Sequence, residues 1–171
     1  LGARLKFRSP VGHMIVNIGG GISNVAVLSM GGVVVSDNIP VGGDLVDQAI
    51  MNYVRRRYGV LIGERTAEDI KIQIGHVFRH ERPLYMRVCG RSLAEGLPRE
   101  ILLSSKEMIE ALAEPITSIL DSVVGVVERT PPALVGDILE QGGITMTGGG
   151  SLLRGLDQLI EKVTGIPTRV A

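Results

Sequence analysis

Two runs of three consecutive glycines, at 19–21 and 148–150, are the residues of this sequence most suited to chemistry. Each run follows a short apolar segment that is typical of a strand. Glycine weakens a strand because it packs nothing and loses much conformational entropy on folding. Such a loop is therefore either a tight turn or a segment whose backbone approaches a ligand. In the second case its N–H groups can bind an anion such as phosphate.

The first loop, at 19–21, matches neither of the two common phosphate-binding sequences. A dinucleotide-binding loop needs G-x-G-x-x-G and then a helix, whereas residues 25–28 are typical of a strand. A P-loop needs Gly-Lys followed by Ser or Thr, and no such residues follow here. Two interpretations stay open: a hairpin whose glycines adopt positive φ, and a concave run of N–H groups that binds phosphate.

The second loop, at 148–150, lies between a predicted strand at 144–147 and a predicted helix at 152–163. A loop of this kind leaves the N–H groups of the first helical turn free for a ligand. The alternative is a tight connection in which Ser151 caps the helix. Two such loops far apart in the sequence, each at the end of an apolar strand, favour a shared anion site over coincidence.

Hydrophobic periodicity predicts the elements that must position these loops. Strands at 14–18, 24–29 and 32–39 should form an antiparallel meander, because glycine-rich gaps join them. A helix is expected from Asp44 to a stop at Gly59, with Leu45 inward, and a short helix is expected with Thr66 and Asp69 as a capping box. Strands are expected at 84–88 and 99–103, followed by a long helix that a capping box of Ser104 and Glu107 opens and Pro115 interrupts. A short helix started by Thr130-Pro131-Pro132, a helix at 152–163 with Val163 inward and a strand at 166–170 complete the expected elements.

Composition narrows the classes of protein and of site. The 171 residues suit one domain, or a domain with a subdomain, and their net charge of zero argues against binding to nucleic acid or anionic lipid. The single cysteine, Cys89, is expected to be a buried or edge thiol in a reducing compartment. No apolar run approaches the roughly 20 residues that span a bilayer, and no signal peptide is visible. His76 and His80 lack a third ligand, so no metal site is expected.

Several segments together resemble the MreB family of bacterial actin-like rod-shape proteins. They are NIGGGISNVAVLSMGGVVVS, IPVGGDLVDQAI, YVRRRYGVLIGERTAEDIKIQIG, GRSLAEGLP, TPPALVGDIL and GGITMTGGGSLLRGLDQLI. The likeness covers nearly the whole chain, and GERTAEDIK and TGGGSLLRGLD separate this family from other actin, Hsp70 and sugar-kinase-like ATPases. It implies an α/β fold: an actin-like ATPase (ribonuclease H-like) domain with a smaller inserted α+β subdomain.

The resemblance divides the chain into a larger ribonuclease H-like subdomain, residues 1–41 and 106–171, and a smaller inserted one, residues 42–105. It implies that this chain is the second half of an ATP-binding cleft. The other phosphate loop, the acid that positions the attacking water and the membrane-binding segment would then belong to a first half outside this sequence. The start at Leu1 fits a piece of a longer protein.

The implied function is that of a nucleotide-dependent filament subunit involved in cell-shape determination. The protein is expected in the cytoplasm, at the inner face of the cell membrane. Its expected partners are further copies of itself and the cell-shape and wall-synthesis machinery. No nucleic acid is expected, and membrane contact is expected only through the first half.

The resemblance also implies nucleotide-binding residues and a cofactor, ATP or ADP with Mg²⁺ in the intact protein. Half a cleft is expected to hold ATP weakly. Glu68 and Lys71 would hold the adenosine end, although a solvated ion pair is the alternative because their spacing puts both on one helix face. Gly19, Gly20, Gly21 and Ile22 would wrap the β- and γ-phosphates, and Gly148, Gly149, Gly150 and Ser151 would run beneath the nucleotide.

The phosphate motif departs from the family pattern D-I-G-G-G-T-T-E at three positions. Asn17 replaces the acid associated with the metal, Ile22 replaces a hydroxyl, and Asn24 replaces another acid. Magnesium prefers charged oxygen ligands, and metal charge is central to phosphoryl transfer. Backbone binding of phosphate should survive, whereas ATP turnover is expected to be slow or absent, and no catalytic residue is assigned.

Two other functions remain as alternatives. One is a degenerate, nucleotide-insensitive interaction module of the same superfamily, which Asn17 and Ile22 favour. The other is an enzyme or chaperone such as a kinase, which would need a substrate-binding domain or phosphoacceptor site that is not visible.

Overall fold

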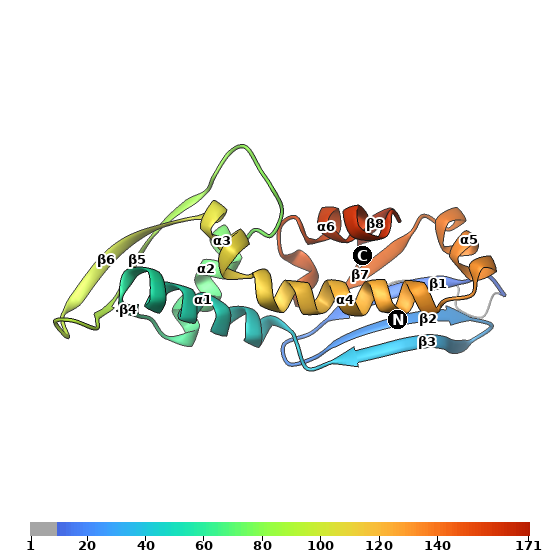
Figure 1. Cartoon of the computed structure of the whole chain (residues 1–171), viewed down its shortest axis with the longest axis horizontal. Helices are drawn as coiled ribbons and strands as arrows, with labels where there is room; N and C mark the ends of the chain where they lie inside the picture. Colours follow the sequence, from blue (N-terminus) through green and yellow to red (C-terminus); the bar gives the residue numbers. More distant parts are fainter. Residues whose placement is uncertain (1–9) are drawn as a thin grey trace.

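The chain forms two β-sheets at opposite ends of an elongated molecule, in a computed structural model that describes residues 10–171 (Figure 1). The larger sheet has the strand order β3-β2-β1-β7-β8 and the smaller one β4-β5-β6. The strands are β1 (His13–Ile18), β2 (Ser23–Ser29), β3 (Gly32–Ile39), β4 (Val60–Leu61), β5 (Tyr85–Ser92), β6 (Pro98–Ser104), β7 (Ile144–Thr147) and β8 (Thr168–Val170). The helices are α1 (Gly43–Tyr58), α2 (Glu64–Ile74), α3 (Ser105–Ala111), α4 (Ala113–Arg129), α5 (Pro132–Glu140), the short 3₁₀ helix η1 (Gly149–Leu152) and α6 (Leu156–Thr164).

The predicted antiparallel meander of the first three strands is confirmed. β1 pairs with β2 and β2 with β3 in antiparallel register, whereas β7 runs parallel to both β1 and β8. The parallel register sets Asn17, near the end of β1, opposite Thr147 at the end of β7. Both glycine loops follow these positions, so strand pairing brings the two loops together.

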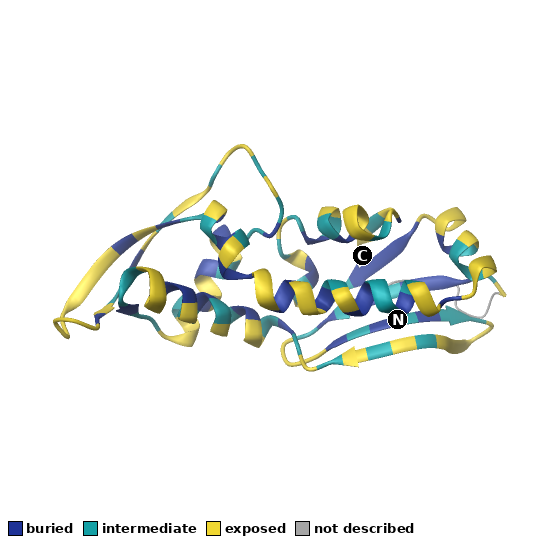
Figure 2. Cartoon of the chain, viewed as in Figure 1, coloured by how far each residue is buried: buried dark blue, intermediate teal, exposed yellow. Residues whose placement is uncertain are grey.

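The larger sheet is covered by α4, which packs on β2 and β3 and beside α6. Its buried residues recur every three to four positions, the spacing of one helical face; they include Ile116, Ile119, Val123 and Val126. Figure 2 shows buried and exposed residues alternating along this helix. Burial of each such side chain contributes about 1.5–3 kcal/mol to stability, so this apolar face holds α4 against the larger sheet.

The smaller sheet has one covered and one open face. Helix α2 packs on β5 and α1 on β4, and residues alternate along β5 between the two environments, as the side-chain period of a strand requires. Val88 is buried, whereas Tyr85, Arg87 and Cys89 are exposed. The expectation of a buried or edge thiol at Cys89 is therefore wrong, since its side chain lies on the open face of the middle strand.

The predicted interruption of the long helix at Pro115 is confirmed. Helix α3 ends at Ala111 and α4 begins at Ala113, which leaves Pro115 in the first turn of α4. Proline is tolerated there because first-turn N–H groups have no partner within the helix. None of the described helices is long and apolar enough to cross a membrane.

The predicted capping box at the start of α3 is also confirmed, and it has a second role. Ser104 Oγ accepts from the N–H of Lys106 at 3.1 Å, and Glu107 Oε2 accepts from the N–H of Ser104 at 2.8 Å. Glu107 Oε1 also accepts from the hydroxyls of Tyr53, at 3.1 Å, and Tyr58. Burial, and then these bonds to Glu107, raise the pKa of both tyrosines to about 12. The carboxylate thereby joins α1 to α3.

The predicted start of the helix near Thr66 is wrong. Helix α2 begins at Glu64, because the N–H of Ala67 closes the first turn on Gly63 O at 3.0 Å, so Thr66 lies inside the helix and caps nothing. Helix α5 begins at Pro132, within the predicted start at Thr130-Pro131-Pro132. Thr130 belongs to the end of α4, where its Oγ1 donates to Val126 O at 2.6 Å.

The chain after the second glycine loop also differs from the prediction. A 3₁₀ turn, η1, follows the glycines, and α6 begins only at Leu156. Ser151 Oγ donates to Gly148 O at 2.6 Å, so the alternative in which Ser151 caps the helix is wrong. The inward orientation expected for Leu45 and Val163 is wrong as well, since they are 45% and 44% exposed.

Candidate functional site

A pocket of about 870 Å³ lies where the larger sheet meets α1 and α2. Four parts of the chain line it: the end of β1 with the first glycine loop, the start of α1, one face of α2, and the second glycine loop with the residues that follow it. Ile116 and Ile119 of α4 form an apolar wall. The two glycine loops therefore share one pocket, which separate turns on different faces would not do.

The first loop connects β1 and β2 and presents free backbone donors. The N–H of Gly19 donates to Ile22 O at 2.9 Å, which closes the turn. Within the described chain, the N–H groups of Gly20, Gly21 and Ile22 donate to no other group. None of the three glycines has a positive φ, so the hairpin interpretation with left-handed glycines is wrong. A run of N–H groups without partners is suited to an anion.

The second loop contacts the first through Ile18, the last residue of β1. A methyl group added to Gly148 would clash with Ile18 O, and one added to Gly150 would clash with the Ile18 side chain. Close packing thus requires glycine at both positions. Gly149 is different, because a methyl group there would meet no atom within 4 Å and its φ is not positive.

Gly21 shares this property with Gly149: an added methyl group would meet no atom within 4 Å. At Gly20 the nearest atom would be Asp44 Oδ1 at 3.6 Å, an ordinary van der Waals distance. Neither backbone conformation nor packing therefore requires glycine at positions 20, 21 and 149. Of these three, Gly20 and Gly149 line the pocket. A ligand that approaches the backbone closely would explain their lack of side chains.

The start of α1 packs directly on the first loop. The N–H groups of Gly43 and Asp44 donate to Gly19 O and Gly20 O at 2.9 and 2.8 Å. A methyl group on Gly42 would clash with both of these carbonyl oxygens. These bonds use N–H groups that a helix start leaves unpaired. They hold the carbonyl oxygens of Gly19 and Gly20 against α1, and the free N–H groups of the first loop stay unpaired within residues 10–171.

Helix α2 brings Glu68 and Lys71 into the pocket lining. Their predicted alternative, a solvated ion pair with each other, is not formed in the part of the chain that the structure describes. Lys71 instead forms an ion pair with Asp47 of α1, with Nζ and Oδ1 2.9 Å apart. Glu68 is exposed and remains available to a ligand.

The residues present do not form a magnesium site. Asn17 supplies an uncharged amide whose Oδ1 accepts from Thr147 Oγ1 at 3.0 Å. Among residues 10–171, no group of three or more His, Cys, Asp or Glu side chains could hold a metal ion. Asp44 lies beside Gly20 of the first loop, but within residues 10–171 it belongs to no group of three or more such side chains that could hold a metal.

His76 and His80 leave helix α2, as expected, and their rings stack with centroids 3.8 Å apart. Burial, then the neighbouring His80 and Arg154, lower the pKa of His76. The N–H of Val77 donates to Arg154 O at 3.0 Å, and Arg154 Nη1 donates to Ile72 O at 3.0 Å. This segment therefore ties α2 to the chain that follows the second glycine loop.

The structure gathers part of the predicted site and adds to it. Six of the predicted residues line the pocket, and the other four, which belong to the same two loops, do not. Those that line it are Gly19, Gly20, Glu68, Lys71, Gly149 and Gly150, and the others are Gly21, Ile22, Gly148 and Ser151. Sequence reasoning missed Gly43, Asp44 and Asp47, although the pair Gly42-Gly43 before a helix was a signal of the same kind as the two loops.

Comparisons with known proteins extend over the whole chain. Residues 1–171 match the model of the family described as MreB/Mbl protein. The chain is 50% identical over 171 residues to the cell shape-determining protein MreB of Escherichia coli (strain K12), a match that covers 100% of this chain and 49% of that protein. The chain thus spans about half the length of the curated relatives it matches.

Solved structures show the same fold. The structure of MreB5 of Spiroplasma citri bound to ADP matches with a TM-score of 0.94 and 39% identity, over 99% of this chain and 51% of that one. The MamK double helical filament matches with a TM-score of 0.74 and 20% identity, over 93% of this chain and 49% of that one, which shows a shared fold. The predicted actin-like α/β fold is confirmed.

Proposed function

The chain belongs to the MreB/Mbl family, and from this premise we propose that it forms the second half of the nucleotide cleft in an actin-like filament protein that determines bacterial cell shape. Residues 10–41 and 106–171 of the described chain would act as the larger subdomain and 42–105 as the inserted smaller one. The nucleotide would lie in the pocket between them, against the two glycine loops.

One observation carries the assignment of a nucleotide. Two glycine loops from distant parts of the sequence line one pocket, and glycine at positions 20 and 149 serves no purpose in the fold. Free N–H groups at 20–22 suit the phosphates. Glu68 accepts and Lys71 donates hydrogen bonds, which suits the hydroxyls of the adenosine end. The related MreB5 structure holds ADP.

ATP turnover is proposed to be slow, because the metal position does not fit Mg²⁺. Asn17 is neutral, and its amide oxygen is already bonded to Thr147. The charge of a metal ion lowers the barrier to phosphoryl transfer. Weak binding of Mg²⁺ would therefore slow ATP hydrolysis more than it would weaken nucleotide binding. Filament assembly would then depend on whether a nucleotide is bound, and not on its hydrolysis.

Self-association, location and partners follow from the family as proposals for the whole protein. Copies would join head to tail, a contact that does not close and so produces filaments; the fold neighbour MamK is a double helical filament. The protein would work in the cytoplasm at the inner face of the membrane, together with the cell-shape and wall-synthesis machinery.

A nucleotide titration of the full-length protein tests the cleft. We expect saturable binding of ATP and ADP, measured by calorimetry, and loss of at least about tenfold in affinity in Gly149→Asp, because a carboxylate there repels phosphate. Gly136→Asp is the matched control, since Gly136 is exposed on α5 and an added methyl group meets nothing within 4 Å. Equal affinities in the two variants, or no binding by the wild type, would contradict the proposal.

The second candidate is a nucleotide-insensitive interaction module, which the side chains of Asn17 and Ile22 favour. Ile22 is 53% exposed and stands where the family has a hydroxyl. Filament assembly that sedimentation shows to be the same with and without nucleotide would support this alternative.

A further inference from the structure

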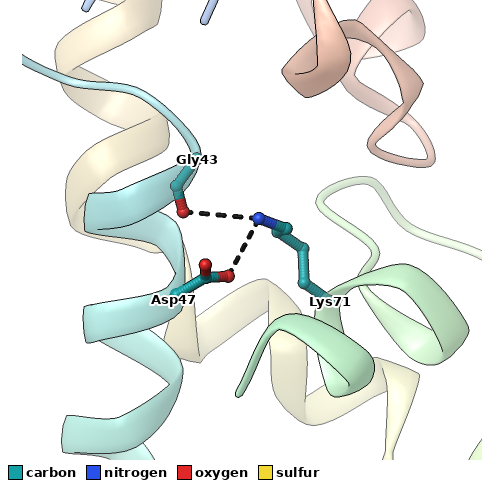
Figure 3. A network of polar contacts seen from close by, with 3 residues as sticks. All are labelled: Gly43, Asp47 and Lys71. Atoms are coloured by element: carbon teal, nitrogen blue, oxygen red, sulfur yellow. Dashed lines mark hydrogen bonds and ion pairs between the residues drawn. The ribbon is translucent and has the colours of Figure 1, made fainter. Parts of the chain in front are cut away.

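Lys71 reaches from α2 to the first turn of α1, where two oxygen atoms hold its ammonium group (Figure 3). Nζ lies 2.9 Å from Asp47 Oδ1 and donates to Gly43 O at 3.4 Å. The side chains of Lys71 and Asp47 are only 21% and 15% exposed. The pair is therefore screened less by water than an ion pair on the surface.

The same turn of α1 touches the first glycine loop on its other side. Gly43 donates its N–H to Gly19 O at 2.9 Å while its carbonyl accepts from Lys71. A methyl group on Gly43 would lie 3.2 Å from Lys71 Nζ, and one on Gly42 would clash with Gly19 O. The two adjacent glycines thus allow the loop and the ammonium group to approach one turn of backbone together.

Asp47 has no other described partner for the oxygen that faces Lys71. Its Oδ1 is inaccessible to solvent and accepts no hydrogen bond from any group in residues 10–171, so the charge of Lys71 alone compensates it. A buried carboxylate oxygen costs free energy unless a cation compensates it. The ammonium has three N–H donors; one donates to Gly43 O, which leaves donors for a ligand in the pocket.

Glu68 is a second carboxylate that could pair with Lys71 in place of Asp47. Glu68 lies one helical turn before Lys71 on α2, lines the same pocket and is exposed. At this spacing the two side chains can pair. Asp44 and Glu64 line the pocket too. Without the charge of Asp47, the ammonium would be free to swing toward Glu68, and both groups would then be lost to a ligand.

We propose that Asp47 is a positioning residue of the nucleotide pocket: it holds the Lys71 ammonium against α1, beside the phosphate loop, and keeps Glu68 free. This inference rests on the proposed nucleotide function. Asp47 itself does not touch the ligand; it acts through Lys71. Loss of its charge therefore weakens nucleotide binding only where Lys71 is present.

A double-mutant cycle in the full-length protein tests this relation. The variants are Asp47→Asn, Lys71→Gln and the double variant, and the readout is the dissociation constant of ADP from calorimetry. We expect Asp47→Asn to weaken binding about tenfold in the wild-type background and less than about twofold in the Lys71→Gln background. Asp47→Glu, which keeps the charge, should recover most of the affinity. Asp69→Asn, which removes an exposed carboxylate from α2, should bind as the wild type does.

The melting temperature without nucleotide distinguishes a positioning role of Asp47 from a role in folding stability alone. A purely structural Asp47 would lower the melting temperature in Asp47→Asn and leave the ADP dissociation constant unchanged, and this result would overturn the inference. An equal loss of affinity in both backgrounds would overturn it as well. If the wild type does not bind ADP, the proposed function itself fails; if it binds and Asp47→Asn binds equally, only the role of Asp47 fails.

Discussion

Thr147 donates a hydrogen bond from Oγ1 to Oδ1 of Asn17 across 3.0 Å, at the point where β7 and β1 end side by side. Each residue lies just before a glycine loop, so one side-chain bond joins the bases of both loops. A threonine hydroxyl can donate to an amide or to a carboxylate equally well. The bond can therefore form with either Asn or Asp at position 17.

Asn17→Asp is expected to restore a metal-associated carboxylate without disturbing the fold. The new carboxylate accepts from Thr147 as the amide did, so the melting temperature should change little. Because Mg²⁺ prefers charged oxygen ligands, the affinity for ATP in the presence of Mg²⁺ should rise about tenfold, whereas affinity measured with a chelator should not. Calorimetric titration with and without Mg²⁺ measures both quantities.

Asn52→Asp provides the control for the added charge. Asn52 is exposed on α1, and its Oδ1 already accepts from Gln48 at 3.3 Å. The Asn52→Asp variant should leave the Mg²⁺ dependence of ATP binding unchanged. An equal gain in both variants would assign the effect to net charge instead of to position 17.

The glycines of the second loop are expected to differ in their effect on stability. Gly150→Ala places a methyl group against the Ile18 side chain, and overpacking of this kind costs about 1–3 kcal/mol. Gly149→Ala meets no atom within 4 Å at a φ that is not positive, so its free energy of unfolding should stay within about 0.5 kcal/mol of the wild type. Urea denaturation without nucleotide measures both, and equal destabilisation would contradict the packing described here.

Glu107→Ala is expected to destabilise the protein by about 2–4 kcal/mol. It removes half of the capping box of α3 and the acceptor of two tyrosine hydroxyls, of which only Tyr53 is buried. A lost cap costs about 1 kcal/mol, and the buried Tyr53 donor left unpaired costs about 1–3 kcal/mol. Glu110→Ala, an exposed site on the same helix, should change the free energy of unfolding by less than about 0.5 kcal/mol. Chemical denaturation compares the two, and similar losses would count against this role of Glu107.

The lowered pKa of His76 should make the stability of the protein depend on pH. Its pKa in the folded state lies below the ordinary value of 6.5, so the unfolded chain takes up a proton at a higher pH than the folded chain does. Its contribution to stability is then complete above pH 6.5 and is lost as the pH falls through the lower, folded pKa. Thermal unfolding of His76→Asn should show a weaker fall in melting temperature on acidification than the wild type. Parallel curves for the two proteins would refute this.

Much of the local structure could be predicted, because side-chain spacing determines it directly. The capping box at Ser104 and Glu107 and the interruption before Pro115 depend on residues within a few positions of each other. Where the prediction was wrong, a distant or backbone contact decided. Helix α2 begins before Thr66 because Gly63 O closes the first turn, and the second loop continues as a 3₁₀ turn because Gly148 and Gly150 pack against Ile18.

The sequence by itself determined that two side-chain-free loops would each follow an apolar strand, since strand and glycine signals are local. It also predicted that Glu68 and Lys71 lie on one helix face, and the family resemblance assigned them to the adenosine end. Only the tertiary structure decided that Lys71 pairs with Asp47 instead, and that α1 closes the pocket against the first loop. The physical reason is that an ion pair forms between whichever charges helix packing brings within reach, and that packing depends on burial of apolar faces from the whole chain.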